Sequence, residues 1–176
     1  GLARVNWTKH KKQVMLFKVL KPGGVRVYIP KILITGPYNA GKSSFIHALS
    51  DRAISVDRFG TTVALDHGHV DYNGYSIDIF GTPGQERFDP MLKTLGGEAM
   101  GVMLVIDSSN TQEFPRAKEM LARSKTHGLP QVVVANKQDI DGALPVEEIR
   151  EKMKLPEDIP IIPTVAPKRK GVIEAL

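Results

Sequence analysis

Cysteine is absent from the 176 residues, and its absence rules out several kinds of chemistry. Without a thiol there can be no disulfide framework, no cysteine-ligated zinc site and no thiol nucleophile. Long apolar runs are missing as well, because segments such as 32–35 and 102–106 are only strand-sized and far too short to span a bilayer. We therefore expect one cytoplasmic domain, large enough to bury roughly two thirds of its unfolded surface.

Acidic residues are also missing from the first 31 residues, which contain eight lysines and arginines. Subtracting these from the total charge of +5 leaves the other residues at about −3. The basic balance thus belongs to a leader, residues 1–30, in which two apolar stretches flank the turn-like sequence at 21–24. We interpret the leader as a solvated segment or an extra hairpin, with a peripheral membrane contact or an RNA contact as further hypotheses.

From residue 31 onward, apolar runs of strand length alternate with stretches of helical spacing, a pattern typical of βα units around a parallel sheet. Between the second and third runs, Asn73-Gly74 is a strong hairpin signal, so these two strands should be antiparallel. The sequence predicts an α/β fold with a mostly parallel six-stranded sheet, flanked by helices and containing one antiparallel strand. Strands are predicted near 31–35, 63–71, 75–80, 101–107, 131–135 and 160–164, and helices near 42–50, 88–97, 112–127 and 145–153.

The octapeptide Gly36 to Ser43 matches G-x-x-x-x-G-K-[ST] and lies after a buried strand and before a helix, as a phosphate-binding loop requires. Its glycines let backbone N–H groups turn inward, and the helix N-terminus adds its dipole. Lys42 would supply a positive charge to the β and γ phosphates, and the Ser43 hydroxyl would ligate Mg²⁺. The nucleotide contacts predicted in this region are Gly36, Tyr38, Asn39, Ala40, Gly41, Lys42, Ser43 and Ser44.

A second polar motif, Asn136-Lys137-Gln138-Asp139, follows the apolar run 132–135 and so lies at the carboxyl end of a strand, where ligands bind in open α/β sheets. The Asp139 carboxylate can accept hydrogen bonds from both N1–H and the N2 amino group of guanine. Adenine would leave this carboxylate unpaired, which discriminates strongly against it. The two motifs together predict a site for GTP and GDP, with Asn136, Lys137 and Asp139 at the base.

These motifs resemble the small GTPase superfamily of the Ras, Rab and Arf kind over residues 31–176, which implies a P-loop NTPase fold, or G domain. The sequence from Gly84 to Phe88 is similar to the third motif of the superfamily, and Thr164-Val165-Ala166 is similar to the fifth. The resemblance implies base contacts from Val165 and Ala166, with the Ala166 N–H facing the guanine O6. Residues 171–176 look like the opening of the final helix that the resemblance implies.

The resemblance also implies a molecular switch that hydrolyses GTP to GDP slowly and uses Mg²⁺. Lys42, Thr62 and Gln85 would be the catalytic residues, with Gln85 orienting the attacking water near Gly84. Thr62 would hold Mg²⁺ together with Ser43. Loss of the γ phosphate would release the segments around Thr62 and from Gly84 to Leu95, so effectors and regulators should bind this face.

One departure from the family pattern concerns the metal, because Gly81 stands where the third motif normally has an aspartate. Asp78 lies three residues earlier on the same predicted strand, and this odd offset should point it to the opposite face. Mg²⁺ would then be held by Ser43, Thr62, phosphates and water, with weaker retention. A non-acidic residue at this position resembles prokaryotic small GTPases of the MglA type, and we place the chain in that branch.

Two further departures lie in the phosphate-binding loop. Tyr38 occupies a position that is small in Ras-type proteins, so its phenol would slow hydrolysis or demand a different activator. Asn39 resembles the asparagine of Era-like GTPases that helps to hold K⁺, which makes potassium a second cofactor hypothesis. Two alternative functions remain, namely a GTP-binding scaffold that does not hydrolyse, suggested by Gly81 and Tyr38, and an RNA- or ribosome-associated GTPase, suggested by Asn39, the basic leader and Lys168-Arg169-Lys170.

Overall fold

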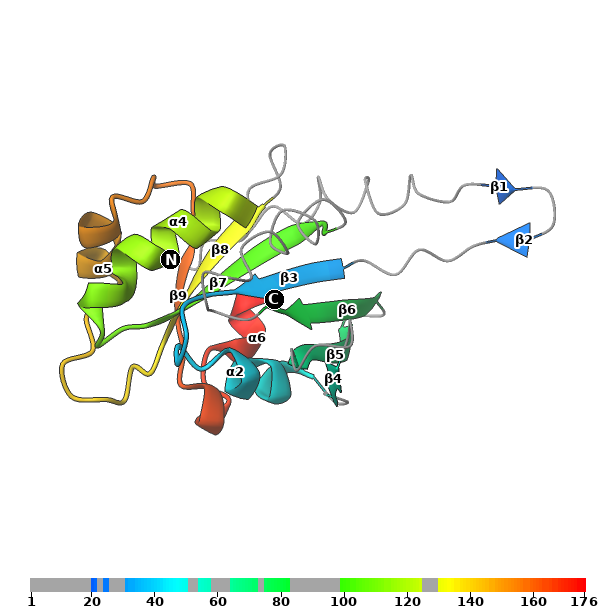
Figure 1. Cartoon of the computed structure of the whole chain (residues 1–176), viewed down its shortest axis with the longest axis horizontal. Helices are drawn as coiled ribbons and strands as arrows, with labels where there is room; N and C mark the ends of the chain where they lie inside the picture. The colour runs from blue at the N-terminus through cyan, green and yellow to red at the C-terminus, as the bar shows by residue number, and fades with distance from the viewer. Residues whose placement is uncertain are drawn as a thin grey trace.

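The computed structural model describes residues 20–21, 24–25, 31–50, 54–57, 64–72, 75–82, 99–124 and 130–176. Within these ranges a seven-stranded sheet has the order β4-β5-β6-β3-β7-β8-β9 (Figure 1). Its strands are β3 (Lys31–Thr35), β4 (Ile54–Asp57), β5 (Ala64–Tyr72), β6 (Tyr75–Gly81), β7 (Gly101–Asp107), β8 (Gln131–Asn136) and β9 (Ile161–Pro163). All six predicted strands are present, and β4 adds a seventh at one edge.

The direction of the strands agrees with the predicted α/β fold. Strand β5 pairs antiparallel with both β4 and β6, whereas β6, β3, β7, β8 and β9 pair parallel with one another. Only β5, among the described strands of this sheet, therefore runs against the rest. Because the carboxyl ends of parallel strands meet at one edge, the loops that follow β3, β7, β8 and β9 gather there.

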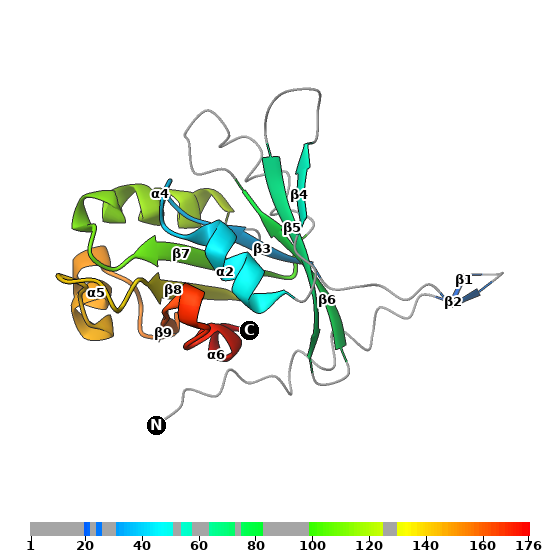
Figure 2. The ribbon, with the colours of Figure 1, turned by 90° about the horizontal axis from the view of Figure 1, so that it is seen from below.

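Helices cover both faces of the sheet. The helices are α2 (Lys42–Leu49), α4 (Phe114–Ser124), α5 (Val146–Met153) and α6 (Val172–Ala175), with short 3-10 helices η2 (Thr111–Glu113) and η3 (Ala166–Lys168). Figures 1 and 2 show α4 and α5 on one face and α2 and α6 on the other. Three of the four predicted helices correspond to α2, α4 and α5, and the fourth, 88–97, lies outside the described residues.

Two apolar cores lie between these layers, because alternate residues of each strand point to opposite faces. Leu33 and Leu104 belong to the core beneath α4 and α5, whereas the next residues, Ile34 and Val105, belong to the core beneath α2 and α6. Both faces of the central strands are therefore buried, which explains their continuous apolar sequences.

A separate antiparallel pair, β1 (Leu20–Lys21) and β2 (Gly24–Val25), joins Leu20 with Val25 and Lys21 with Gly24. It flanks residues 22–23, within the turn-like sequence of the leader. The extent of the hairpin and the domain boundary at residue 30 stay predictions. Among the described residues, no helix has both the length and the apolar character needed to cross a membrane.

Candidate nucleotide-binding site

The phosphate-binding loop connects β3 to α2 at the carboxyl edge of the sheet, and its two motif glycines are sterically required. Gly36 has φ 152°, and a Cβ atom there would collide with the carbonyl oxygen of Val105 on the neighbouring strand. Gly41, the N-cap of α2, has φ 92°, and a Cβ atom would lie 2.5 Å from Nδ2 of Asn136. Only glycine permits both the backbone conformation and the close approach.

The other residues of this loop surround the start of α2. Lys42 Nζ donates hydrogen bonds to the carbonyl oxygens of Gly36 and Pro37 at 2.7 and 2.9 Å, so its ammonium group lies against the loop. Ala40 is buried, whereas Tyr38, Asn39, Ser43 and Ser44 are exposed. Asn39 adopts a left-handed conformation with φ 62°. The loop residues that were predicted to contact nucleotide thus all lie before or within the first turn of α2.

Asn136 ties the base motif to two other motifs. Its side chain is 1% exposed, and Nδ2 donates to the carbonyl oxygen of Ala40 at 3.2 Å. Its Oδ1 accepts from the Thr164 hydroxyl and from the Ala166 N–H, each at 3.1 Å. The Ala166 N–H that was expected to face guanine therefore already has a partner, and the Val165 N–H donates to the Lys170 carbonyl. The first, fourth and fifth motifs converge on this one amide.

Lys137 makes a second link between the base motif and the loop. Its Nζ donates to the Asn39 carbonyl at 2.7 Å and forms an ion pair with Asp107 Oδ2 at 2.9 Å. Burial alone would raise the pKa of Asp107, but hydrogen bonds from Ser109 and Lys137 together hold that pKa below its ordinary value of 3.8. Asp107 thus stays ionised at neutral pH and holds the lysine against the loop.

A buried hydroxyl orients the rest of the base motif. Ser108 is fully buried, and its Oγ donates to the Asn136 carbonyl at 2.7 Å. Gln138 Nε2 donates to Ser108 Oγ at 2.7 Å and to the Leu144 carbonyl at 3.1 Å. Asn136 and Gln138 of the motif are therefore both bonded to Ser108, which directly follows β7.

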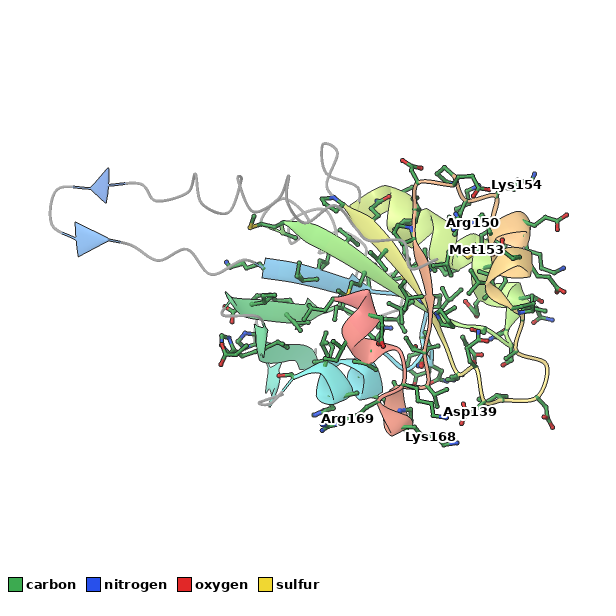
Figure 3. The ribbon with its side chains drawn as sticks, turned by 180° about the vertical axis from the view of Figure 1, so that it is seen from behind. Asp139, Arg150, Met153, Lys154, Lys168 and Arg169 are labelled. Atoms are coloured by element: carbon green, nitrogen blue, oxygen red, sulfur yellow. The ribbon has the colours of Figure 1, made fainter. Side chains whose placement is uncertain are left out.

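Asp139, the predicted guanine reader, is 42% exposed and extends from the carboxyl edge of the sheet. Its Oδ2 lies 3.6 Å from Nζ of Lys168, which belongs to η3 (Figure 3). This contact places an ammonium group beside the carboxylate that would receive the base. It also joins the fourth motif to the segment that follows the fifth.

The predicted switch residues Thr62, Gly84 and Gln85, and the partner segment from Gly84 to Leu95, lie outside the described residues. Gly81 is the last residue of β6 and pairs with Ile34 of β3. Because glycine has no side chain, this position offers no carboxylate to a metal. Asp78 has the orientation predicted for it, because it accepts from His69 Nδ1 at 2.9 Å while Ile77 and Ile79 point into the opposite core. The exposed hydroxyl of Ser43 remains an oxygen ligand of the kind that Mg²⁺ takes.

Three site residues were not predicted from the sequence, namely Asp107, Ser108 and Lys168. Asp107 and Ser108 lie at the carboxyl end of β7, beside the end of β8, and this position in a parallel sheet could have indicated a role. Lys168 carries no comparable signal, because its contact with Asp139 depends on how η3 lies beside the base motif.

The sheet order, the glycine-dependent phosphate loop and the base motif bonded to that loop define a small P-loop GTPase. The model of the ADP-ribosylation factor family matches residues 18–176, and the chain belongs to this family. Placement in the MglA-type branch stays a prediction.

Similar proteins agree with this family. ADP-ribosylation factor-related protein 1 of Rattus norvegicus is 31% identical over 129 residues, which cover 68% of this chain and 64% of that protein. The chain thus spans a little less than two thirds of that relative. ADP-ribosylation factor-like protein 3 of Chlamydomonas reinhardtii is 30% identical over 129 residues, covering 71% and 72% of the two chains.

A solved structure shows the same fold. The Arl6 BBS3 small GTPase from Trypanosoma brucei, with the bound nucleotide analogue GppNp, matches with a TM-score of 0.69 and 21% identity. The match covers 84% of this chain and 93% of that chain.

Proposed function

We propose that this chain binds GTP and GDP with Mg²⁺ and acts as a switch that hydrolyses GTP slowly. The observation that carries the proposal is the side chain of Asn136, which is bonded to Ala40 of the phosphate loop and to Thr164 and Ala166 of the fifth motif. Three segments that are distant in sequence are thereby held around one site. A phosphate loop and a base-reading carboxylate on one edge suit a nucleoside di- or triphosphate.

The base would be selected by Asp139, whose exposed carboxylate can accept two hydrogen bonds from guanine. Lys137 would contribute beside Asp139, because its ammonium group is held between the Asn39 carbonyl and Asp107. The Ala166 N–H, which now donates to Asn136 Oδ1, would reach the guanine O6 by sharing or exchanging that acceptor. An adenine ring would present an amino group and no N1–H, which leaves the carboxylate without its two donors.

The phosphates would bind at the N-terminus of α2, where Lys42 supplies positive charge and backbone N–H groups point outward. Lys42 now donates to two loop carbonyls, and it would exchange these for phosphate oxygens. Ser43, and Thr62 in the GTP state, would hold Mg²⁺, which neutralises charge on the phosphates. Potassium bound by Asn39 is a further hypothesis, and equal turnover in KCl and NaCl would reject it.

Hydrolysis would depend on Gln85 orienting a water, and the unassisted rate should be of order 10⁻⁴ to 10⁻³ s⁻¹, as for Ras-like domains. With so slow a reaction, the conformations of the segments around Thr62 and from Gly84 to Leu95 would be the useful output. Protein effectors and regulators would read these segments.

Titration with fluorescent GDP and ADP analogues tests nucleotide binding and base selection. The chain should prefer GDP by at least about a hundredfold, since a site built on hydrogen bonds rejects a ligand that leaves its groups unpaired. Asp139→Ala should remove this preference. Asp141→Ala is the matched control, because Asp141 is exposed in the same loop and should leave the preference unchanged. Equal affinity of the unaltered chain for both nucleotides would overturn the proposal.

A second candidate function is a scaffold that binds GTP without hydrolysing it. It is favoured by the residues that stand where the third motif normally holds Mg²⁺. Gly81 supplies no carboxylate, and Asp78 is turned away to His69. Phosphate release measured with excess Mg²⁺ separates the two functions. Release that is abolished by Gln85→Ala supports the hydrolysing switch, whereas GTP binding without any release supports the scaffold.

A further inference from the structure

A pocket on the outer face of the molecule lies between the N-terminal half of α4 and the C-terminal end of α5, and its volume is about 450 Å³. Phe114 and Met153 line its floor; they belong to the core, are 4% and 2% exposed, and so offer a small apolar surface. Its lining is completed by exposed Thr111, Pro115, Lys118, Lys152 and Lys154. None of these residues belongs to the phosphate loop or to the base motif.

The charges around this pocket differ from those elsewhere on the two helices. The arginines of α4 and α5 are each close to a glutamate: Arg116 and Arg123 contact Glu119, and Arg150 lies 3.9 Å from Glu157. The three lysines that line the pocket, in contrast, form no ion pair with any residue that the structure describes. Their charges are therefore available to a ligand, within the described part of the chain.

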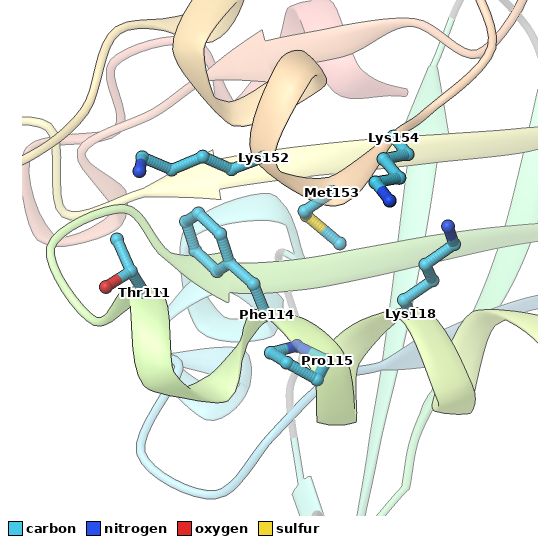
Figure 4. A pocket seen from close by; sticks show the side chains of 7 residues that line it. All are labelled: Thr111, Phe114, Pro115, Lys118, Lys152, Met153 and Lys154. Carbon is cyan, nitrogen blue, oxygen red and sulfur yellow. The ribbon is translucent and has the colours of Figure 1, made fainter.

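The three lysines of the pocket place their ammonium groups at its two ends (Figure 4). Figure 4 shows the ammonium groups of Lys118 and Lys154 extending toward each other across one end of the pocket, with Lys152 at the other end above Phe114. Lys152 and Lys154 lie at the C-terminus of α5, where the helix dipole favours positive charge. The dipole of α5 does not account for Lys118, which belongs to α4. An anion bound near Lys118 and Lys154 would be attracted by both positive charges.

We propose that this pocket docks an acidic segment of a partner protein, with one aromatic or large aliphatic side chain on the floor formed by Phe114 and Met153. Carboxylates on either side of that residue would pair with Lys118, Lys152 and Lys154. Lysine is a point charge on a flexible stem, which suits carboxylates at several spacings. The pocket has no arginine fork that would grip a phosphate in a bidentate way. An apolar centre inside a polar rim is the usual anatomy of a protein docking site.

The test is binding of a fluorescein-labelled peptide, Asp-Glu-Asp-Phe-Glu-Asp-Glu, to the full 176-residue chain, followed by fluorescence anisotropy and by amide NMR shifts. We expect saturable binding that weakens as salt is added, with shifts at residues of the pocket. Lys118→Glu and Lys154→Glu should each weaken binding by about three- to tenfold. Each change removes one exposed ion pair with the peptide and adds a repulsion between two carboxylates. Lys170→Glu is the matched control, because Lys170 is an exposed lysine outside the pocket.

Two altered peptides separate the two parts of the site. Replacing the phenylalanine by alanine should weaken binding through loss of the apolar contact, and replacing all acids by their amides should abolish it. The proposal is overturned if the acidic peptide does not bind at 1 mM, or if Lys118→Glu and Lys170→Glu have equal effects. It is also overturned if only inorganic phosphate, or only vesicles that contain phosphatidylserine, shift the pocket resonances. Circular dichroism of each variant confirms that it is folded.

Discussion

Replacing Asn136 by alanine should lower the free energy of unfolding by about 3 kcal/mol, because this side chain makes three buried hydrogen bonds. Each bond contributes about 1 kcal/mol, and the variant would leave the Ala40 carbonyl, the Thr164 hydroxyl and the Ala166 N–H without their partner. Thr164 and Ala166 are nearly fully buried, so water cannot readily replace the lost amide.

Urea unfolding of the nucleotide-free chain, followed by circular dichroism, measures this effect. With a slope of about 2 kcal/mol per molar urea, the midpoint should fall by about 1.5 M. Nucleotide must be absent, since ligand bound to the folded state would add its own stabilisation.

Asp139→Ala is the matched control for this experiment. It changes a neighbouring residue of the same motif, but Asp139 is 42% exposed and its described partner is Lys168 at 3.6 Å. We expect a change in unfolding free energy within about 0.5 kcal/mol, as for most surface substitutions. If Asn136→Ala destabilises the chain no more than Asp139→Ala does, then Asn136 does not hold the three motifs together, and the reasoning is refuted.

Three further outcomes follow from the contacts of the site and the neighbouring strands. Asp78→Asn should bring the pKa of His69 down toward 6.5, because the hydrogen bond to Asp78 is the largest cause that raises it; an unchanged NMR titration of the His69 ring would contradict this. In the unaltered chain the hydrogen bond between His69 and Asp78 gives the folded state its full stabilisation below pH 6.5. This stabilisation is lost as pH rises through the raised pKa of His69. Asp107→Asn should cost about 1 kcal/mol at pH 7 by removing the ion pair with Lys137. The lowered pKa of Asp107 means that this difference, measured by urea unfolding, should persist at pH 5 and shrink only as pH falls below 3.8. Gly41→Ala should abolish binding of fluorescent GDP, since its Cβ would lie 2.5 Å from a buried amide nitrogen at φ 92°; GDP affinity equal to that of the unaltered chain would show that the loop tolerates a side chain.

The switch itself is tested by hydrogen exchange of residues 83–98 with a non-hydrolysable GTP analogue and with GDP. Slower exchange in the analogue complex is expected if the γ phosphate orders this segment. Identical exchange in both complexes would favour the scaffold function.

Local patterns in the sequence were sufficient for six strands of the main sheet, for helices α2, α4 and α5, and for recognising the phosphate loop and the base motif. Runs of Ile, Leu and Val of strand length located six strands, and Asn73-Gly74 indicated the antiparallel pair of β5 and β6. Such signals depend only on neighbours in the chain, so they can be read without the fold. Strand β4 was missed, because Ile54–Asp57 is a short segment without a marked apolar run.

The glycines of the phosphate loop were also predicted to be necessary, but the reason for each became visible only in three dimensions. Gly36 is confined by a carbonyl oxygen of β7, and Gly41 by the side chain of Asn136. A motif shows that a glycine is needed at a position, whereas the atoms that exclude a Cβ come from strands far along the chain.

By itself, the sequence determined that this chain is an α/β domain with a phosphate loop and a guanine motif, because periodicity and motif spacing are local properties. The tertiary structure decided how the motifs are connected: Asn136 to Ala40, Asp107 to Lys137, Lys168 to Asp139, and Asp78 to His69 rather than to the metal side. These contacts join residues of different strands and loops. They depend on strand order and register, which the packing of the whole sheet fixes and no single segment encodes.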